Sequence, residues 1–484
     1  MNNNSLFNFD NSYLSLPDKF YSIVNPTPVA KPEMVLLNDD LLQQLQITSA
    51  DNKLLTEILS GNVIPNNTTP FAQAYAGHQF GHFTMLGDGR AIHLGEHITK
   101  ENNRFDIQLK GSGQTPYSRR GDGRATLKAM LREYLISEAM YHLNIATSRS
   151  LAVVKTGEPV YRETVSEGAV LTRIMKSHIR VGTFEYARYH GTIDDLKALT
   201  NYTIRRLFPE IEHNEMPALS LLESVMHLQI NLVVQWMSVG FIHGVMNTDN
   251  TSISGETFDY GPCAFMNTYH TETVFSSIDS EGRYAFGNQP RIIKWNLTRF
   301  AEALLPTIHS DSEKAIKLAQ QAIDAFDLLW KEKYYEAMLN KLGIENKKPE
   351  DNVLVEELLQ LMQTHQLDYT NTFSALQFEI DFDPNPLQKA ELKVWVEKWK
   401  LRISENTKGF ETAKSIMQEN NPVFIPRNHM VEEALNKAVK GDFSLYNKLL
   451  NILKTPYKYN ENFHTYIMPP DKIFEESYQT FCGT

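Results

Sequence analysis

Glycine and basic residues crowd into one stretch of the chain, residues 77–123. Its glycines include Gly77, Gly81, Gly87, Gly89, Gly111, Gly113, Gly121 and Gly123, and its cations include Arg90, Lys110, Arg119, Arg120 and Arg124. Glycine lets backbone N–H groups approach an anion closely, and such concavities bind phosphate. Tight hairpin turns with solvated arginines are the alternative, but this density of glycine and positive charge favours a phosphate-binding surface.

Lys110 and Glu133 have the spacing of a second phosphate-binding feature. Lys110 ends an alternating apolar segment, and Glu133 follows 23 residues later within a helical pattern. A strand lysine held by a helix glutamate presents its ammonium group to nucleotide phosphates. The alternative is a surface lysine and a glutamate on a solvated helix face.

A second polar group lies in the sequences FIHGVMNTDN (residues 241–250) and FDYGP (residues 258–262). Asn250 and Asp259 offer the hard oxygen ligands that Mg²⁺ prefers and shares with nucleotide phosphates. The order of the two segments matches that of a kinase, with Asp-Tyr-Gly in place of Asp-Phe-Gly. Taken alone, Asp259 also fits a turn before Gly-Pro.

One position departs from the kinase pattern. A kinase has its catalytic base two residues after the catalytic-loop histidine, and here Val245 occupies that position after His243. Valine cannot accept a proton, so ordinary phosphoryl transfer to a hydroxyl is disfavoured. Asp249 is the nearest carboxylate that could orient or deprotonate a nucleophile, and its alternative role is that of an N-cap.

Two further pairs have less specific spacing. Arg173 and Arg180 present planar donors that suit phosphate oxygens, although surface positions fit them equally well. His78 and His82 resemble a helical metal pair, but glycines precede both and no HExxH glutamate is present, so a zinc hydrolase is not expected. We interpret both histidines as packing or nucleotide-loop residues.

The elements that must position these residues fall into two halves. Alternating apolar residues predict strands near residues 91–94 and 105–110, and two apolar runs at 151–154 and 170–175 fit strands of the same sheet. Helical spacing predicts a helix over 127–143. Beyond about residue 190 the chain becomes mainly helical, including an amphipathic stripe over 392–399 and a helix over 430–439. This pattern predicts an α+β fold with two lobes and a ligand cleft between them.

Composition narrows the class of protein. The chain has 47 Lys and Arg against 58 Asp and Glu, a formal charge of −11, which argues against a general nucleic-acid or anionic-membrane binder. Two cysteines exclude a disulfide-stapled scaffold and a Cys-rich zinc module. No apolar run approaches the roughly 18 residues that span a bilayer, and the N-terminus lacks the pattern of a signal peptide. We therefore expect a soluble protein of a reducing cytoplasm.

Long, ordered blocks of the sequence resemble the selenoprotein O family, a group of kinase-like proteins that act as protein adenylyltransferases. The blocks are PTPV (26–29), AYAGHQFGHF, LGDGRA, QLKGSGQTPYSRRGDGRA, HGVMNTDN, DYGP, FSSID (275–279), GRYAFGNQP (282–290) and NPVFIPRN (421–428). They run almost end to end and are far more specific than any short motif above.

The resemblance implies a protein-kinase-like fold with a small mixed sheet lobe and a larger helical lobe. We expect an N-terminal extension at 1–60 packed on the body, an N-lobe with nucleotide loops at 61–188, and a helical C-lobe with a C-terminal extension at 189–484. Bound ATP would be flipped, so that AMP passes to a Ser, Thr or Tyr hydroxyl of a protein substrate and pyrophosphate leaves. We expect a monomer with no nucleic-acid or membrane partner.

The resemblance also implies roles for individual residues. Nucleotide contacts would fall to Gly87, Gly89, Arg90, Lys110, Asp122, Gly123, Arg173 and Arg180. Asp249 would accept the proton, Asn250 and Asp259 would hold Mg²⁺ (with Mn²⁺ as the alternative metal), and Glu133 would support Lys110.

The C-terminal tail adds a redox hypothesis. Cys482 is third from the end, where animal members of the family carry selenocysteine and many bacterial members cysteine. In some members this residue bonds to a second cysteine and regulates activity. The other cysteine here, Cys263, directly follows Asp-Tyr-Gly-Pro, which departs from the family pattern. A Cys263–Cys482 disulfide across the metal loop is one hypothesis, and two unrelated free thiols is the favoured one.

Two other classes of function stay open. A nucleotide-binding pseudokinase scaffold would bind ATP without turnover. An ATP-dependent small-molecule kinase would fit the seven-residue separation of His243 and Asn250.

Overall fold

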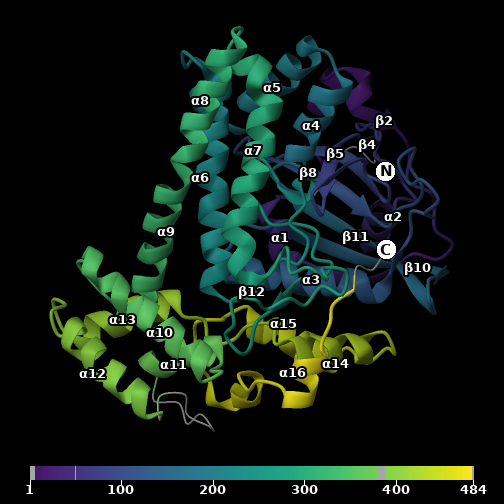
Figure 1. Ribbon diagram of the computed structural model, residues 1–484. Helices are drawn as coiled ribbons and strands as arrows, with labels where there is room; N and C mark the ends of the chain where they lie inside the picture. Colours follow the sequence, from purple (N-terminus) through teal and green to yellow (C-terminus); the bar gives the residue numbers. More distant parts are fainter. Residues whose placement is uncertain (1–5, 49–50, 379–386, 388, 482–484) are drawn as a thin grey trace.

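The alternating apolar segments of the sequence form the centre of a nine-stranded antiparallel sheet (Figure 1). The structure is a computed structural model that describes residues 6–48, 51–378, 387 and 389–481. The strand order is β2-β4-β7-β8-β11-β10-β3, with β1 beside β7 and β9 beside β11. The strands of this sheet are β1 (Phe9–Asp10), β2 (Tyr21–Ile23), β3 (Glu33–Leu37), β4 (Phe71–Gln73), β7 (Ala91–Ile98), β8 (Arg104–Lys110), β9 (Ala125–Thr126), β10 (Arg149–Tyr161) and β11 (Val165–Met175).

The two strands predicted from alternation are confirmed as β7 and β8, the two predicted from apolar runs as β10 and β11, and the predicted helix as α3 (Leu127–His142). Lys110 lies opposite Ala91 of β7 and Leu171 of β11, so it ends a strand that has a partner on each side. The N-terminal segment, expected as an arm on the body, contributes β1, β2 and β3 to the same sheet.

Two hydrophobic cores cover the two faces of the sheet. Helices α1 (Asp39–Gln44) and α2 (Asn52–Ser60) pack on one face, where Leu55 and Ile58 join Leu94 and Leu109. On the other face the buried side of α3 continues into the core of the helical lobe. Helix α3 is therefore enclosed between the sheet and the second lobe, which fixes any charged group on its buried side.

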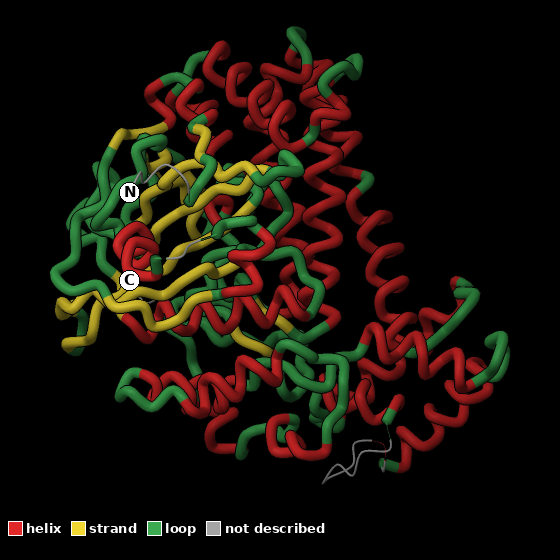
Figure 2. The backbone as a smooth tube through the Cα atoms, turned by 180° about the vertical axis from the view of Figure 1, so that it is seen from behind, coloured by secondary structure: helices red, strands yellow, loops and turns green. Residues whose placement is uncertain are grey.

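The helical lobe is confirmed beyond about residue 190, and Figure 2 shows its helices beside the strands of the sheet lobe. Its helices are α4 (Val181–His190), α5 (Ile193–Leu207), α6 (Pro217–Ser238), α7 (Gln289–Ile308), α8 (Ser312–Asp324), α9 (Phe326–Lys341), α10 (Asn352–Thr364), α11 (Tyr369–Gln377), α12 (Ala390–Ile403), α13 (Phe410–Asn420), α14 (Asn428–Ala438), α15 (Ser444–Leu453) and α16 (Lys472–Ser477). The structure also has two short two-stranded antiparallel sheets. One pairs β5 (Ala76–Gln79) with β6 (His82–Met85), and the other pairs β12 (Phe241–Ile242) with β13 (Ala264–Phe265).

Helix α6 corrects the expectation that no segment is apolar enough to span a membrane. Among the described residues it is the one helix that is long and apolar enough to do so by length and composition. Its side chains are largely buried, including Leu221, Val225 and Val233. In this structure α6 is a core helix of the second lobe, where it packs against α7, α8 and α9 (Figure 1).

The C-terminal helices hold α3 from the side away from the sheet. The Tyr446 hydroxyl on α15 donates to the carbonyl of Leu131 at 2.8 Å, and Arg132 pairs with Glu432 of α14 at 3.1 Å. Segments 300 or more residues away in the chain thus fix the helix that carries Glu133.

Candidate active site

Four charged side chains from four elements meet at the end of β8. The Lys110 ammonium lies 2.7 Å from Glu133 Oε2 and also contacts the carboxylate of Asp259. Arg173 of β11 donates through Nε to Glu133 Oε1 at 2.9 Å and lies 3.4 Å from Asp259 Oδ1. The structure thus brings together a strand lysine, a helix glutamate and the aspartate of the Asp-Tyr-Gly loop. Because Lys110 and Glu133 are buried, they are not the surface pair of the alternative interpretation.

The cations of this cluster keep its carboxylates ionised. Desolvation opposes the effect, but Lys110, Arg173 and Arg90 hold the pKa of the Asp259 carboxyl well below its usual range. Burial likewise raises the pKa of Glu133, and Arg173 and Lys110 more than offset it, so the net shift is downward. The Asp259 side chain is 37% exposed, so its carboxylate is charged and accessible to a ligand.

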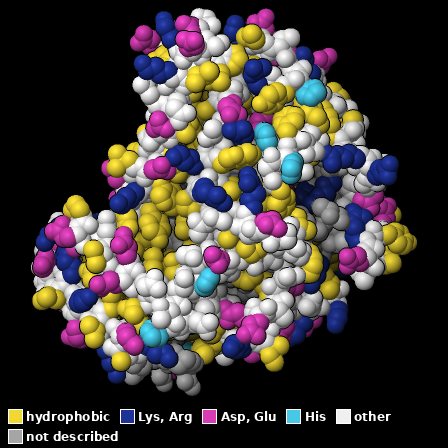
Figure 3. Space-filling model, viewed as in Figure 1, with side chains coloured by type: hydrophobic (Ala, Val, Ile, Leu, Met, Phe, Trp, Pro, Cys, Tyr) yellow, Lys and Arg dark blue, Asp and Glu magenta, His cyan; other side chains and the backbone are white. Residues whose placement is uncertain are grey.

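A cavity of about 550 Å³ opens beside the cluster. Arg90, Lys110, Glu133 and Gly261 line it together with residues 477–481 of the C-terminal segment. On the face drawn in Figure 3, Lys and Arg side chains lie around a hollow over the sheet lobe. A cationic cavity between two lobes suits a phosphate-bearing ligand.

The loop with the second carboxylate approaches from the helical lobe. A short 3₁₀ turn, Thr248–Asn250, carries both Asp249 and Asn250. The Asn250 amide nitrogen donates to the carbonyl of Val245 at 3.0 Å, which leaves the amide oxygen as the atom that could bind a metal. Val245 is buried, and the ring of His243 bridges to the carbonyl of Phe258 at 3.2 Å, joining this loop to the loop of Asp259.

Asp249 has surroundings unlike those of Asp259. Its side chain is 7% exposed, and among the described residues its Oδ1 atom is buried without a hydrogen-bond partner. Burial raises the pKa of Asp249 to about 6, although Arg180 lowers it. A carboxylate whose pKa lies near neutrality can take up a proton at one step and lose it at another.

Arg180 connects the two carboxylate loops to the glycine-rich segment. Its guanidinium donates to the backbone carbonyl of Asp249 at 3.2 Å, lies 3.5 Å from Asp88 Oδ1, and stacks 3.9 Å from the ring of Tyr75. Arg173 and Arg180 are each 4% exposed, so the surface interpretation is wrong for both.

The glycines at 87 and 89 are needed for close packing. A side chain at Gly87, where φ is 149°, would overlap the ring of Tyr117, and one at Gly89 would lie 3.0 Å from the Tyr117 carbonyl. Asp88 between them accepts from the backbone N–H of Gln73 at 3.0 Å. The segment therefore lies under residues 111–124, and Arg90 emerges from it beside the cavity.

Asp122 and Gly123 lie apart from the buried cluster. Asp122 forms a 2.8 Å ion pair with Arg162, and its side chain is 45% exposed. Gly123 has a φ of 68°, and a side chain there would overlap the carbonyl of Gly113.

The redox hypothesis concerns one described cysteine. Cys263 is fully buried, and burial raises the pKa of its thiol to about 11. Cys482 lies outside the described residues, so the proposed disulfide stays a hypothesis.

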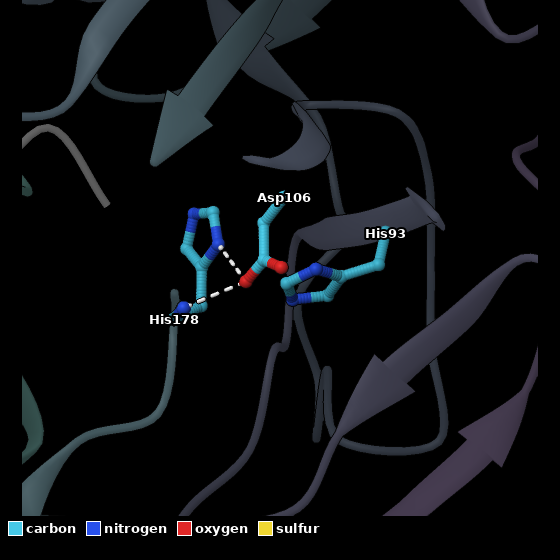
Figure 4. A group of neighbouring side chains, drawn as sticks. All are labelled: His93, Asp106 and His178. Carbon is cyan, nitrogen blue, oxygen red and sulfur yellow. Dashed lines mark hydrogen bonds and ion pairs between the residues drawn. The ribbon is translucent and has the colours of Figure 1, made fainter. Parts of the chain in front are cut away.

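Sequence spacing did not indicate a cluster formed by His93 of β7, Asp106 of β8 and His178 (Figure 4). His178 donates its backbone N–H and its ring Nδ1–H to Asp106 Oδ2 at 2.7 and 3.0 Å, while Arg206 takes Oδ1 at 2.5 Å. Burial lowers the pKa of His178 to about 3, so the ring is neutral. With both carboxylate oxygens already bonded and His93 packed edge-on against the His178 ring, we interpret the cluster as a structural hydrogen-bond network.

Fold and site together define a class of protein. A sheet lobe with a lysine–glutamate pair, joined to a helical lobe whose adjacent loops carry an asparagine and an aspartate, defines a kinase-like nucleotide-dependent enzyme.

Comparison with known proteins names the family. The family model described as "Protein adenylyltransferase SelO" matches residues 4–454. Proteins named protein nucleotidyltransferase YdiU from Bacillus mycoides (strain KBAB4) and Bacillus cereus (strain B4264) are 53% and 52% identical over 486 aligned residues, covering 100% of this chain and 99% of theirs. The chain belongs to the SelO family, and it is a nucleotidyltransferase.

Proposed function

We propose that this chain transfers AMP from ATP to Ser, Thr or Tyr hydroxyls of protein substrates and releases pyrophosphate. One observation carries the proposal. The two loop carboxylates have opposite surroundings, Asp259 among cations and Asp249 nearly enclosed, while Val245 fills the position of a kinase base. The family description and the relatives' names support the same chemistry.

The triphosphate would bind against the cations at the end of β8. Arg90, Lys110, Arg173 and Arg180 would neutralise its charge, and the backbone at Gly87, Gly89 and Gly123 together with Asp122 would complete the contacts. Glu133 would keep Lys110 and Arg173 in place through its two carboxylate oxygens. The α-phosphate would face the open side of the cleft.

Asn250 and Asp259 would hold Mg²⁺, with Mn²⁺ as the alternative. Their donors fit a hard cation, since one offers an amide oxygen and the other an ionised carboxylate. Mg²⁺ bound there would offset the negative charge of the phosphates and of the leaving pyrophosphate.

Asp249 would take the proton in the transfer step. The acceptor hydroxyl oxygen bonds to the α-phosphorus, the bond from that phosphorus to the oxygen bridging the α- and β-phosphates breaks, and pyrophosphate leaves with the electron pair. The hydroxyl proton passes to the Asp249 carboxylate, whose Oδ1 has no other donor among the described residues.

ATP labelled separately on the α- or the γ-phosphate tests the proposal. We expect α-label to enter protein and γ-label to leave as pyrophosphate. Protein labelled from the γ-phosphate only would make the chain a protein kinase. A γ-labelled small molecule with ADP would make it a small-molecule kinase, and ATP binding without turnover would leave a scaffold.

We also propose a cytoplasmic monomer without nucleic-acid partners. The formal charge of −11 supports the absence of nucleic-acid partners, because phosphate backbones repel an acidic protein.

A further inference from the structure

The hairpin of β5 and β6 is an element that the proposed reaction does not use. Phe80 and Gly81 form its two-residue turn, with φ values of 50° and 87°. Both values are left-handed, which is the geometry of a tight two-residue hairpin turn. We predicted no strand here from the sequence, because glycine and histidine occupy four of the ten positions 76–85.

This hairpin is bonded to the loop that carries Asp249. The backbone N–H of Phe80 donates to Asn247 Oδ1 at 3.1 Å, and that of His78 donates to Thr248 Oγ1 at 2.7 Å. The two segments lie about 170 residues apart in the chain. Two consecutive side chains of the loop are thus held by the hairpin, one by strand β5 and one by its turn.

Asp249 itself packs against the same strand. The Gln79 amide approaches Asp249 Oδ2 at 3.4 Å, and a side chain at Gly77 would overlap the Asp249 carboxylate. Helix α4 also packs closely against both the hairpin and the Asp249 loop. A side chain at Gly182 of α4 would overlap the carbonyl of Ala76 and lie 3.3 Å from Asp249 Cα. The position of the carboxylate therefore depends on how closely the hairpin and α4 hold its loop.

Glu185 of α4 ties the hairpin and the loop together. One of its carboxylate oxygens lies 2.5 Å from His78 Nδ1, and the other accepts from the Thr248 hydroxyl at 2.5 Å. A carboxylate only accepts hydrogen bonds, so both partners donate to it. The Thr248 hydroxyl then donates to Glu185 while it accepts from the His78 backbone, which fixes its rotamer. Glu185 is 1% exposed, and no lysine or arginine pairs with it among the described residues.

We propose that Glu185 is a positioning residue for the proton acceptor Asp249, acting through Thr248 and His78. The inference rests on the proposed function, because it takes Asp249 as the group that receives the acceptor proton. Glu185 holds the side chain of Thr248, which is the first residue of the 3₁₀ turn, and Asp249 is the next residue of that turn. Of the proposed nucleotide-binding cations, Arg90, Lys110 and Arg173 lie on other elements. Arg180 is the N-cap of α4, but it pairs with Asp88 and donates to the Asp249 backbone, and no bond joins it to Glu185 among the described residues. We therefore expect the tie to affect the chemical step far more than ATP binding.

Glu185→Gln tests the inference with little change in volume. The amide keeps one acceptor but replaces the other with a donor, so either the Thr248 hydroxyl loses its acceptor or His78 must change to the tautomer whose Nδ1 accepts. Either change alters the tie between the hairpin and the loop. We expect kcat for AMP transfer to fall about tenfold to a hundredfold, which is the usual effect of displacing a reacting group by a fraction of an ångström. The KM for ATP stays within about twofold.

A matched pair at Thr248 separates hydrogen bonding from packing. Thr248→Ser keeps the hydroxyl and loses a methyl group, whereas Thr248→Val keeps the shape and loses the hydroxyl. We expect Thr248→Ser to stay within about threefold of the wild-type kcat and Thr248→Val to fall as far as Glu185→Gln. Because the two residues share one bond, the double variant Glu185→Gln with Thr248→Val loses no more than either single variant.

Rates are measured with α-labelled ATP, using the chain itself and an added denatured protein as acceptors, and melting temperatures are recorded in parallel. No transfer by the wild type would refute the proposed function. Transfer by the wild type with equal kcat in Thr248→Val and Thr248→Ser would overturn only the positioning role. A rise in the ATP KM at unchanged kcat would overturn it as well. If Glu185→Gln does not fold, the Thr248 pair decides, because both variants retain Glu185.

Discussion

Asp249 and Asp259 lie ten residues apart on neighbouring loops, yet their surroundings differ in charge. Asp259 touches Lys110 and Arg173 and stays ionised at any ordinary pH. Asp249 lies against the backbone of Gly77 with Arg180 as its main cation, and burial raises its pKa to about 6. The comparison shows that position in a loop does not decide what a carboxylate does. Two environments that push the pKa values apart would separate the proposed metal ligand, Asp259, from the proposed proton acceptor, Asp249.

The largest expected effect comes from removing each charge in turn. Asp249→Asn keeps the shape but cannot take a proton, so we expect kcat to fall about 10²- to 10⁴-fold while Mg²⁺-ATP binding stays within about threefold. Asp259→Asn should instead weaken Mg²⁺-dependent ATP binding, because it removes an ionised ligand. Transfer rates and calorimetric titration with Mg²⁺-ATP distinguish the two.

Glu281→Gln is the control for this pair, because it removes an exposed carboxylate of the same lobe. It should change neither quantity. If Asp249→Asn kept more than a tenth of the wild-type kcat, the proton would leave by another route and the comparison would lose its functional meaning.

A smaller effect is expected at the cations that keep Asp259 ionised. Lys110→Met should raise the ATP KM about tenfold to a hundredfold, since it removes an ammonium group from the proposed phosphate site.

Glu133→Gln leaves Lys110 and Arg173 buried with less compensation, so we expect a loss of about 3–5 kcal/mol in the free energy of unfolding. Urea denaturation measures that loss.

An exposed pair provides the matched control for Glu133. Glu357 and Lys398 lie 2.9 Å apart at the surface, and Glu357→Gln should cost less than about 1 kcal/mol. Equal losses in Glu133→Gln and Glu357→Gln would mean that the buried cluster contributes no more than a solvated pair.

Much of the environment of Asp259 could be predicted from the sequence. Lys110 ends a strand with clear alternation and Glu133 lies on a helix with clear periodicity, so local patterns place both residues on the elements that the structure shows. Asn250 and Asp259 follow short motifs whose order along the chain is informative. What spacing could not show is that Arg173 shares Glu133 with Lys110, because that contact depends on strand register.

The environment of Asp249 could not be predicted in the same way. The hairpin at 76–85 carries no strand pattern, and its contacts with residues 247–249 join parts of the chain far apart in sequence. Glu185 lies in no motif, and only its two bonds reveal it. Asp122 is a different case, since the family resemblance implies a nucleotide contact there and the structure shows its carboxylate in a partly exposed ion pair with Arg162.

Glu256, which lies between the two aspartates in the sequence, extends the comparison to the pH dependence of stability. Burial raises the pKa of Glu256 to about 7 from its usual 4.5, although Ser254 and Lys176 donate hydrogen bonds to it. Below pH 4.5 the group is protonated in both folded and unfolded chains, and above pH 7 the folded chain must bury a charge. The contribution of Glu256 to the free energy of unfolding is therefore fully present below pH 4.5. It is lost as the pH rises through about 7, which lowers the free energy of unfolding by on the order of 3 kcal/mol.

Glu256→Gln should remove this dependence. The difference in unfolding free energy between variant and wild type, measured by urea denaturation at pH 5 and pH 8, should favour the variant more at pH 8. An equal difference at both pH values would mean that Glu256 is not the group whose charge is penalised by burial.

The smallest effect is expected at Asp122, which lies outside both environments. Its carboxylate is paired with Arg162 and partly exposed, so solvent screens its charge, and hydrogen bonding from Arg162 lowers its pKa. A nucleotide contact at this position would be peripheral, and Asp122→Ala should raise the ATP KM no more than about threefold with kcat unchanged. Arg162→Ala should have the same small effect if the pair acts as a unit. A rise of tenfold or more in Asp122→Ala alone would mean that the loop of residues 111–124 moves inward when ATP binds, which would add a third charged environment to the site.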